Sequence, residues 1–161
     1  SMDYLWSPWR FHYVTSTGRD DGCVFCFLLS ETSDRQNLIL LRKNHTFLIL
    51  NRFPYTTGHL MVATKRHLAT LGDATSAELT ELILLARESE GLLRKVYRPD
   101  GLNLGFNIGK SAGAGIADHL HLHIVPRWEG DANAVSVIGE TRVIPEELET
   151  TYDKLSAQLE K

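Results

Sequence analysis

The stretch ADHLHLHIVPRW, residues 117–128, places three histidines at every second position and fills the places between them with leucine. Successive side chains of a β-strand point to opposite faces, so this spacing predicts a strand over 119–125. Histidines would lie on one face, available for chemistry, and aliphatic side chains on the other, available for the core. The histidines are His119, His121 and His123; the aliphatic residues are Leu120, Leu122 and Ile124.

A row of imidazoles can perform several kinds of chemistry. Imidazole titrates near pH ~6.5 and is mostly neutral at pH 7, so it can attack an electrophile, carry a proton or bind a metal. The alternative is a half-buried strand whose polar face carries histidine without a chemical role. Just upstream, the stretch GKSAGAG, residues 109–115, would leave backbone N–H groups accessible to a phosphate or similar anion. Together the two features favour a site that acts on phosphorus.

The stretch GFNIGKS, residues 105–111, looks like a phosphate loop of the Walker type. That motif needs four residues between its glycines, and only three separate Gly105 from Gly109. It also needs a helix after the loop, where this chain is predicted to form a strand. A P-loop nucleotide hydrolase is therefore excluded.

The rest of the chain predicts an α+β fold around a mostly antiparallel sheet. HTFLILN (45–51) and HLMVAT (59–64) predict a hairpin, and LNLGFNIG (102–109) predicts a further strand. A helix is expected from about Asp73 to the RPDG stretch at 98–101, with either a capping box from Thr75 to Glu78 or a cap at Asp73 or Ser76. A second helix is expected to begin near Pro145.

Length and charge restrict the classes of function. A chain of 161 residues that is 43% hydrophobic predicts one domain over 1–161. The net charge of -3, with 17 basic and 20 acidic residues spread along the chain, offers no basic stripe for a nucleic acid. The apolar runs are too short to cross a membrane, and MDYLWSPWR near the start has no signal-peptide pattern. We therefore expect a soluble, cytoplasmic protein that binds neither nucleic acid nor membrane.

The two cysteines, Cys23 and Cys26, lie three residues apart in GCVFC. In a reducing compartment this spacing favours a metal or redox pair over a structural disulfide. Two small buried thiols remain a third interpretation. We expect the segment that carries the cysteines to form a turn.

Two segments resemble the histidine triad nucleotide-binding superfamily. They are HLHLHIV (119–125), which is similar to the family signature, and NRFPYTTGHLMVATKRH (51–67), which is similar to the family hairpin. The resemblance covers residues 22–128, and residues 129–161 form a C-terminal extension with a helix. GAGIADHLHLHIVPRW and VIGETRVIPEEL are closer to the bacterial and archaeal diadenosine tetraphosphate phosphorylase branch than to the small phosphoramidases.

The resemblance implies about five antiparallel strands, two helices and a homodimer that joins two sheets into one. It also implies cleavage of a dinucleoside polyphosphate, diadenosine tetraphosphate first, at an α-phosphate. His121 would be the nucleophile and form a nucleotidyl-histidine, which phosphate or water then releases. By the same resemblance His123 contacts the phosphate oxygens, His59 supports the triad and Asn51 contacts the ribose.

The loop around the triad supplies further candidate substrate-binding residues. Small family members carry Gln and Ser where this chain has Ala114 and Gly115, so side-chain donors are lost there. Lys110 and Ser111 would compensate by contacting phosphates, or are solvated loop residues. Trp128 would stack on a base, or packs in the ordinary way. The full set of loop candidates is Asn107, Lys110, Ser111, Gly113, Gly115 and Trp128.

The resemblance also completes a metal site. Several family members bind zinc through a Cys-x-x-Cys pair, the histidine after the hairpin and the first triad histidine. Here these would be Cys23, Cys26, His67 and His119, a closed four-ligand set with a structural role. No organic cofactor is expected.

Three other functions stay open from the sequence. One is a nucleoside phosphoramidase, or a nucleotidylyltransferase with another acceptor. Another is a nucleotide-binding regulator that keeps the pocket and signals through a partner. The third is a zinc-stabilised interaction module, which would bind no nucleotide.

Overall fold

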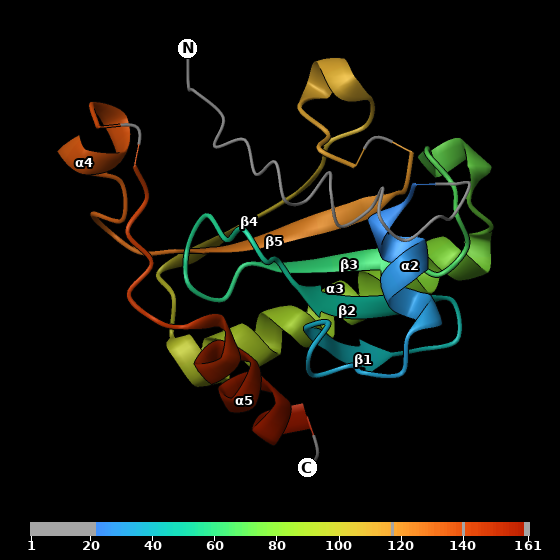
Figure 1. Ribbon diagram of the computed structural model, residues 1–161, viewed down its shortest axis with the longest axis horizontal. Coiled ribbons are helices and arrows are strands. Elements are labelled where there is room, and N and C mark those ends of the chain that lie inside the picture. The colour runs from blue at the N-terminus through green and yellow to red at the C-terminus, as the bar shows by residue number, and fades with distance from the viewer. Residues whose placement is uncertain (1–21, 117, 140, 160–161) are drawn as a thin grey trace.

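The protein folds around one five-stranded antiparallel sheet, seen in a computed structural model that describes residues 22–159 except 117 and 140 (Figure 1). The strand order is β1-β2-β3-β5-β4, and every neighbouring pair is antiparallel. This confirms the α+β prediction. The segment MDYLWSPWR lies outside the described residues. The strands are β1 (Ile39–Arg42), β2 (Thr46–Leu50), β3 (Leu60–Thr64), β4 (Gly101–Phe106) and β5 (His121–Arg127).

The predicted hairpin is strands β2 and β3, paired from Thr46↔Thr64 to Leu50↔Leu60. Its connecting loop ends at Gly58, whose φ is +82°. A Cβ at this position would lie 3.1 Å from a methyl carbon of Leu93. Only glycine combines the positive φ with this close approach, so the loop can fold back onto the helix that covers the sheet.

Two long helices cover the sheet on one side. Helix α3 (Ser76–Tyr97) packs on β2, β3 and β5, and α5 (Leu148–Leu159) packs on α3 and β1. The capping box is confirmed, because the Thr75 side chain accepts from the Glu78 N–H and Glu78 reaches back to Thr75. The second helix begins at Leu148 rather than near Pro145.

Helix α2 (Val24–Ser30) lies on the opposite face of the sheet from α3 (Figure 1). Its Phe25 ring packs edge-on against Phe47 of β2, with centroids 5.8 Å apart. The prediction of a turn here was wrong, because tertiary packing of Phe25 and Leu28 stabilises a seven-residue helix that the sequence marks only weakly. A short helix α4 (Ala134–Val137) lies at the far side of the view from α2.

Two strands differ from the prediction. Strand β1 was not predicted from residue patterns, because four residues with an irregular register between Ile39 and Leu41 show no clean alternation. Strand β5 begins at His121 and runs to Arg127, so His119 precedes it and Pro126 lies inside it. Pairing of β5 with β3 stops at Ile124. Pro126 has no N–H, but it lies beyond this point, so no hydrogen bond to β3 is lost there.

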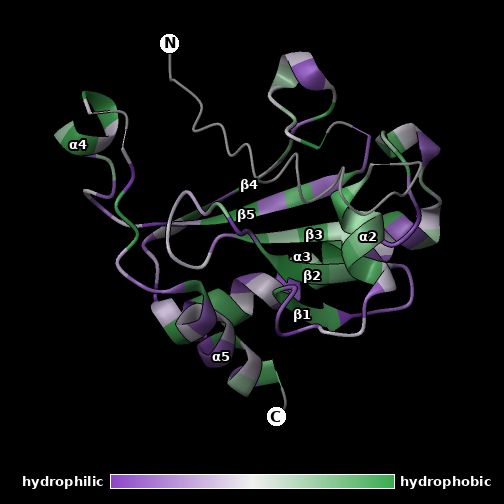
Figure 2. Cartoon of the chain, viewed as in Figure 1, coloured by the Kyte–Doolittle hydropathy of each residue, from purple (hydrophilic) through white to green (hydrophobic). Residues whose placement is uncertain are grey.

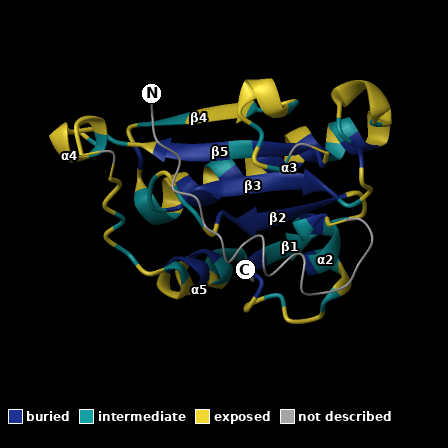
Figure 3. Ribbon diagram, turned by 45° about the horizontal axis from the view of Figure 1, so that its top comes forward, coloured by how far each residue is buried: buried dark blue, intermediate teal, exposed yellow. Residues whose placement is uncertain are grey.

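The core lies on both faces of the three central strands. Every residue of β2 and β3 is buried, while β4 is partly exposed along the edge (Figure 3). The apolar colouring of Figure 2 follows the same central strands. In the part of the chain that the structure describes, no helix has the length and apolar character needed to cross a bilayer.

Candidate active site and metal centre

Strand register places two of the three triad histidines on the α2 face of the sheet. His121 lies opposite Ala63 and His123 lies opposite Met61, whereas Leu122 and Ile124 point to the α3 face. The prediction that histidines and aliphatic residues lie on opposite faces of the strand is therefore confirmed for His121 and His123. Both faces of the strand are covered, and His121 is itself buried.

A backbone carbonyl fixes the protonation pattern of His121. Its Nδ1 lies 2.7 Å from the carbonyl oxygen of His119, which can only accept, so Nδ1 carries the proton and donates it. The lone pair of the neutral ring is then on Nε2. The Phe25 ring packs edge-on at 5.1 Å from the His121 ring and restricts its rotation. In its uncharged form the side chain thus presents Nε2 as a nucleophile.

A second chain of hydrogen bonds orients His123. The backbone N–H of Tyr55 donates to Nδ1 of His59 at 3.1 Å, so the proton of His59 is on Nε2. That Nε2–H donates to Nδ1 of His123 at 2.9 Å. The proton of His123 is therefore on its own Nε2, which becomes a hydrogen-bond donor beside the nucleophile.

Burial keeps these rings neutral at pH 7. Desolvation, followed by the charges of His123, Arg142 and His121, lowers the pKa of His59 to about 3. Desolvation and the neighbouring His121 lower the pKa of His123 to about 4. A neutral relay preserves the donor and acceptor pattern over the physiological pH range.

Asn51 lies at the end of β2 beside this relay. Its Oδ1 accepts from the backbone N–H of Phe53 at 2.9 Å, and its Nδ2 lies 3.4 Å from Nε2 of His59. Asn51 is buried. The structure thus brings the predicted ribose residue into contact with the supporting histidine.

Four side chains converge on a second centre behind the triad. The ligand atoms of Cys23, Cys26, His67 and His119 all lie within 4.8 Å of one another. Cys23 Sγ lies 3.3 Å from His119 Nδ1, and Cys26 Sγ lies 3.4 Å from His67 Nδ1. Tetrahedral coordination with Zn–S and Zn–N bonds of ordinary length separates the ligands by about 3.3–3.8 Å, so the geometry fits a four-coordinate metal.

The protonation pattern of His119 also suits metal binding. Its Nε2 lies 2.6 Å from the Thr64 carbonyl and must donate to it, which leaves the lone pair on Nδ1, the atom that faces the cysteines. Burial lowers the pKa of His119 to about 4, so the ring is neutral. His119 thus faces the cluster through its ring and orients His121 through its carbonyl.

An apolar cavity of about 180 Å³ adjoins the triad on the α2 face. Its walls include Phe25 and Leu28 of α2, Ile49 of β2 and Met61 of β3, the residue paired with His123. Its volume is below the roughly 300 Å³ at which pockets for drug-sized ligands begin, so it suits one ring system rather than a whole nucleotide.

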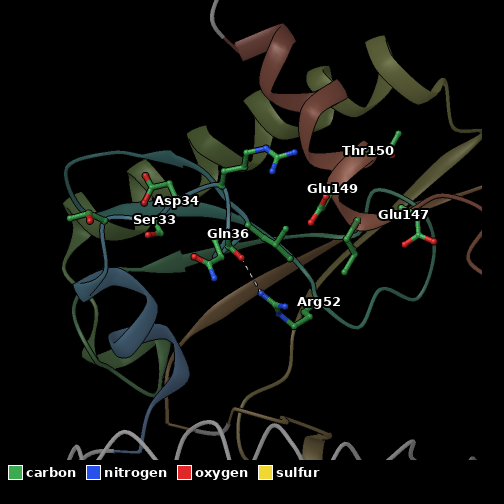
Figure 4. Close-up of a pocket in the computed structure, with 11 residues that line it drawn as sticks. Ser33, Asp34, Gln36, Arg52, Glu147, Glu149 and Thr150 are labelled. Atoms are coloured by element: carbon green, nitrogen blue, oxygen red, sulfur yellow. Dashed lines mark hydrogen bonds between the residues drawn. The ribbon is translucent and has the colours of Figure 1, made fainter.

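A larger open groove of about 1130 Å³ lies away from the triad, between the segment after α2 and the start of α5 (Figure 4). It shares Gln36, Leu38 and Arg52 with the apolar cavity. Arg52 donates to the backbone carbonyl of Gln36 at 3.2 Å, the bond drawn in Figure 4. The apolar cavity is bounded by Phe25, which packs on His121, and by Met61, which pairs with His123, whereas neither residue lines the groove; its size therefore does not make the groove the candidate active site.

The loop candidates lie outside this network. Among the described residues, no hydrogen bond joins Lys110, Ser111 or Trp128 to a triad histidine. Lys110 and Ser111 are exposed on a 3-10 turn (Lys110–Ala112), and the Trp128 backbone donates to Asp131. Asn107 is half-buried, and Gly113 and Gly115 are exposed in the same loop.

Sequence reasoning missed Tyr55 and Arg142. The Tyr55 ring lies 4.6 Å from the His59 ring, and the Arg142 guanidinium lies 4.5 Å above the Tyr55 ring. Arg142 also donates to the Tyr55 carbonyl at 3.3 Å. An aromatic residue four positions before His59 is a faint signal, and nothing in the sequence connects residue 142 with residue 55.

The fold and the site define a class of protein. The HIT domain family model matches residues 32–130, so the chain belongs to the HIT, or histidine triad, family. The AP-4-A phosphorylase of Mycobacterium tuberculosis is 37% identical over 164 residues, covering 98% of this chain and 84% of that protein. A bis(5'-adenosyl)-triphosphatase of Dictyostelium discoideum is 32% identical over 97 residues, 60% of this chain and 64% of that protein.

Solved structures show the same fold. A Zn-bound histidine triad family protein from Mycobacterium smegmatis superposes with a TM-score of 0.68 at 27% identity, covering 86% of this chain and 95% of that one. A hypothetical histidine triad nucleotide-binding protein from Sulfolobus tokodaii gives a TM-score of 0.69 at 29% identity, covering 86% and 92%.

Proposed function

We propose that this protein cleaves dinucleoside polyphosphates, diadenosine tetraphosphate first, at an α-phosphorus through a nucleotidyl-His121 intermediate. The observation that carries the proposal is the bond from His121 Nδ1 to the His119 carbonyl, which assigns the lone pair to Nε2. The M. tuberculosis phosphorylase and the D. discoideum triphosphatase support this substrate class, because their names specify diadenosine compounds.

The reaction has two balanced steps. In the first, the His121 Nε2 lone pair forms a bond to the α-phosphorus, and the bond to the bridging oxygen breaks so that ATP leaves with that electron pair. In the second, an oxygen of inorganic phosphate or water attacks the same phosphorus and the P–N bond breaks. Phosphate yields ADP and water yields AMP; the relationship to the phosphorylase favours phosphate.

His123 stabilises the charge that develops on the phosphoryl oxygens. Its Nε2–H is directed by the relay from Tyr55 and His59, so it donates without first reorganising. The apolar cavity beside Met61 would hold the base. Asn51 would contact the ribose, and Asn107, Lys110, Ser111, Gly113, Gly115 and Trp128 would line the path of the phosphates and the second nucleoside.

We also propose that the metal centre holds a structural zinc ion. The two thiolates and two imidazoles fit zinc, and the M. smegmatis relative is described as zinc-bound. With four protein ligands, zinc would supply no open position to the reaction. Cys23 and Cys26 would tie α2 to His67 after β3 and to His119 before β5.

A homodimer is proposed to form across strand β4. In the described part of the chain, β4 pairs with β5 on one side and with no strand on the other. Leu104 in its middle is 47% exposed. An unpaired edge with an exposed leucine is a ready template for pairing with a second copy. The cytoplasmic location stays a prediction, for cell fractionation to test.

The function is tested by product analysis. Protein would be incubated with diadenosine tetraphosphate, with and without inorganic phosphate, beside His121→Ala and the control His45→Ala, an exposed histidine outside the triad. We expect ADP and ATP with phosphate, no turnover by His121→Ala, and an AMP adduct on the wild type by intact mass when phosphate is left out. An active His121→Ala would overturn the proposal.

A further inference from the structure

The wall of the apolar cavity contains one buried side-chain amide, that of Asn37. Asn37 precedes β1 and is 6% exposed. Its backbone N–H donates to the Ser33 carbonyl at 2.9 Å, so the backbone is satisfied. Its side-chain Nδ2 has no hydrogen-bond partner among the described residues. Buried amides in folded proteins are rarely left unpaired, and such a group calls for an explanation.

The backbone beside Asn37 is held in an uncommon conformation. Leu38, the next residue, has a φ of +63°, in the left-handed region that branched side chains rarely adopt. Its N–H donates to Arg35 and its carbonyl accepts from Leu50, so the conformation is held by pairing on both sides. Leu38 is buried in the same cavity wall. This local geometry keeps the Asn37 side chain in the wall.

The distance from Asn37 to the triad suits a nucleotide. On the α2 face, His123 pairs with Met61, Met61 with Ile49, and Ile49 with Ile39 at the start of β1. These three steps between strands span about 14 Å, at the usual separation of about 4.8 Å each. With the α-phosphorus at His121, the ribose would cross Met61 and the far edge of the base would reach the Asn37 end of the cavity.

We propose that the side-chain amide of Asn37 recognises the adenine base and determines base selectivity. This rests on the proposed function. A carboxamide offers an acceptor beside a donor, and adenine offers its exocyclic amino group beside a ring nitrogen, so the two pair through two hydrogen bonds. The other cavity walls are largely apolar and supply contact area that differs little between bases. The hydrogen bonds then satisfy the amide that is unpaired in the free protein.

A double-mutant cycle tests the pairing directly. The two proteins are wild type and Asn37→Leu, and the two substrates are diadenosine tetraphosphate and its analogue with purine in place of adenine, which lacks only the amino groups. We expect loss of the amino groups to lower kcat/KM at least tenfold in the wild type and less than threefold in Asn37→Leu. Asn44→Leu is the matched control, since it makes the same change at an exposed position that lines neither the cavity nor the groove, and it should behave as the wild type.

The melting temperature gives a second readout that does not depend on activity. If the amide is unpaired in the free protein, Asn37→Leu melts at or above the wild-type temperature. Asn37→Ala, which cannot overpack the cavity, takes its place in the cycle if the leucine variant does not fold.

The results separate this inference from the proposed function. If the wild type cleaves the adenine substrate, but removal of the amino groups lowers kcat/KM by the same factor in the wild type and in every variant, the role of Asn37 is overturned and the proposed function is not. Wild-type protein that cleaves neither substrate overturns the proposed function. An Asn37→Ala variant that melts far below the wild type shows that the amide has a structural partner, and also overturns the inference.

Discussion

Each histidine of this site acquires its chemistry from the group that its second ring nitrogen meets. His119 and His121 both donate to backbone carbonyls, of Thr64 and His119 respectively, and so keep opposite ring atoms unprotonated. His59 accepts a hydrogen bond at Nδ1 from the backbone N–H of Tyr55, so its Nε2–H donates a hydrogen bond to Nδ1 of His123. Four chemically identical side chains are thereby assigned four roles: backbone groups orient His119, His121 and His59 directly, and the His59 side chain orients His123.

The buried relay predicts how stability depends on pH. The pKa of His59 is about 3 in the folded state and ~6.5 when unfolded, so between these values only the unfolded chain binds the proton. The free energy of unfolding should therefore fall as pH drops from 6.5, with His59 contributing at most about 1.4 kcal/mol per pH unit. In His59→Gln this slope should decrease by about that amount, measured by urea unfolding at pH 7, 6 and 5. Parallel curves for the two proteins would contradict the assignment.

At the scale of elements, helix α3 depends on its N-terminal cap. Thr75 accepts from the Glu78 N–H at 3.1 Å, and Glu78 in turn receives the Arg66 guanidinium at 2.9 Å. The cap thus joins the helix to the segment that follows β3. Among the described residues, no hydrogen bond joins Thr75, Glu78 or Arg66 to a triad histidine, so a change at the cap is expected to affect stability rather than activity.

Thr75→Ala is expected to lower the free energy of unfolding by about 1 kcal/mol and to leave kcat unchanged. Thr80→Ala is the matched control, the same change at an exposed position inside the helix, where alanine is the better helix former. Chemical denaturation measures both. Equal stabilities for the two variants would show that the cap contributes nothing.

Helix α2 is the element that the proposed zinc ion would hold in place, through Cys23 and Cys26. Chelation of the metal, or Cys26→Ser, is expected to lower the melting temperature by about 5–10 °C, the equivalent of a few kcal/mol. Turnover measured while the sample is still folded should persist, and elemental analysis should find one zinc per wild-type chain. Immediate loss of turnover on chelation, restored by metal, would instead assign the metal to the reaction.

The parts of this fold that could be predicted are those encoded by short, regular spacings. The alternation around His121, the capping box at Thr75 and the hairpin whose connecting loop ends at Gly58 are each encoded by patterns of nearby residues. Strand β1 and helix α2 could not be predicted, because four and seven residues carry too little pattern and depend on tertiary packing. Arg142 was missed because its significance comes from contacts with Tyr55, far away in the chain. Asn37 was missed because only tertiary packing buries its unpaired amide in the cavity wall.

At the scale of the whole molecule, the sheet is closed on one side and open on the other. Helix α5 packs on the β1 side, whereas the β4 side is exposed (Figure 3). This asymmetry leaves one edge for a second copy. Joining two such edges would make one continuous ten-stranded sheet from two sheets of five.

Leu104→Glu is expected to convert the proposed dimer to a monomer, because it places a charge on the edge strand where the second copy would pair. Sedimentation velocity measures the mass. Val137→Glu is the control, since Val137 is 72% exposed on α4 and lies outside the sheet. A monomeric wild type, or a Leu104→Glu variant of unchanged mass, would exclude this interface.

The two-residue repeat of β5 restricts how this site can evolve. Because His121 and His123 meet Ala63 and Met61 in register, insertion or deletion of one residue between them would move a histidine to the α3 face and a leucine into the site. Even a change of two residues would give one of the two histidines a different partner on β3. Lineages that carry this strand can therefore vary it by replacing residues but not by changing its length, so new substrates must be acquired through the loops and the C-terminal segment around it.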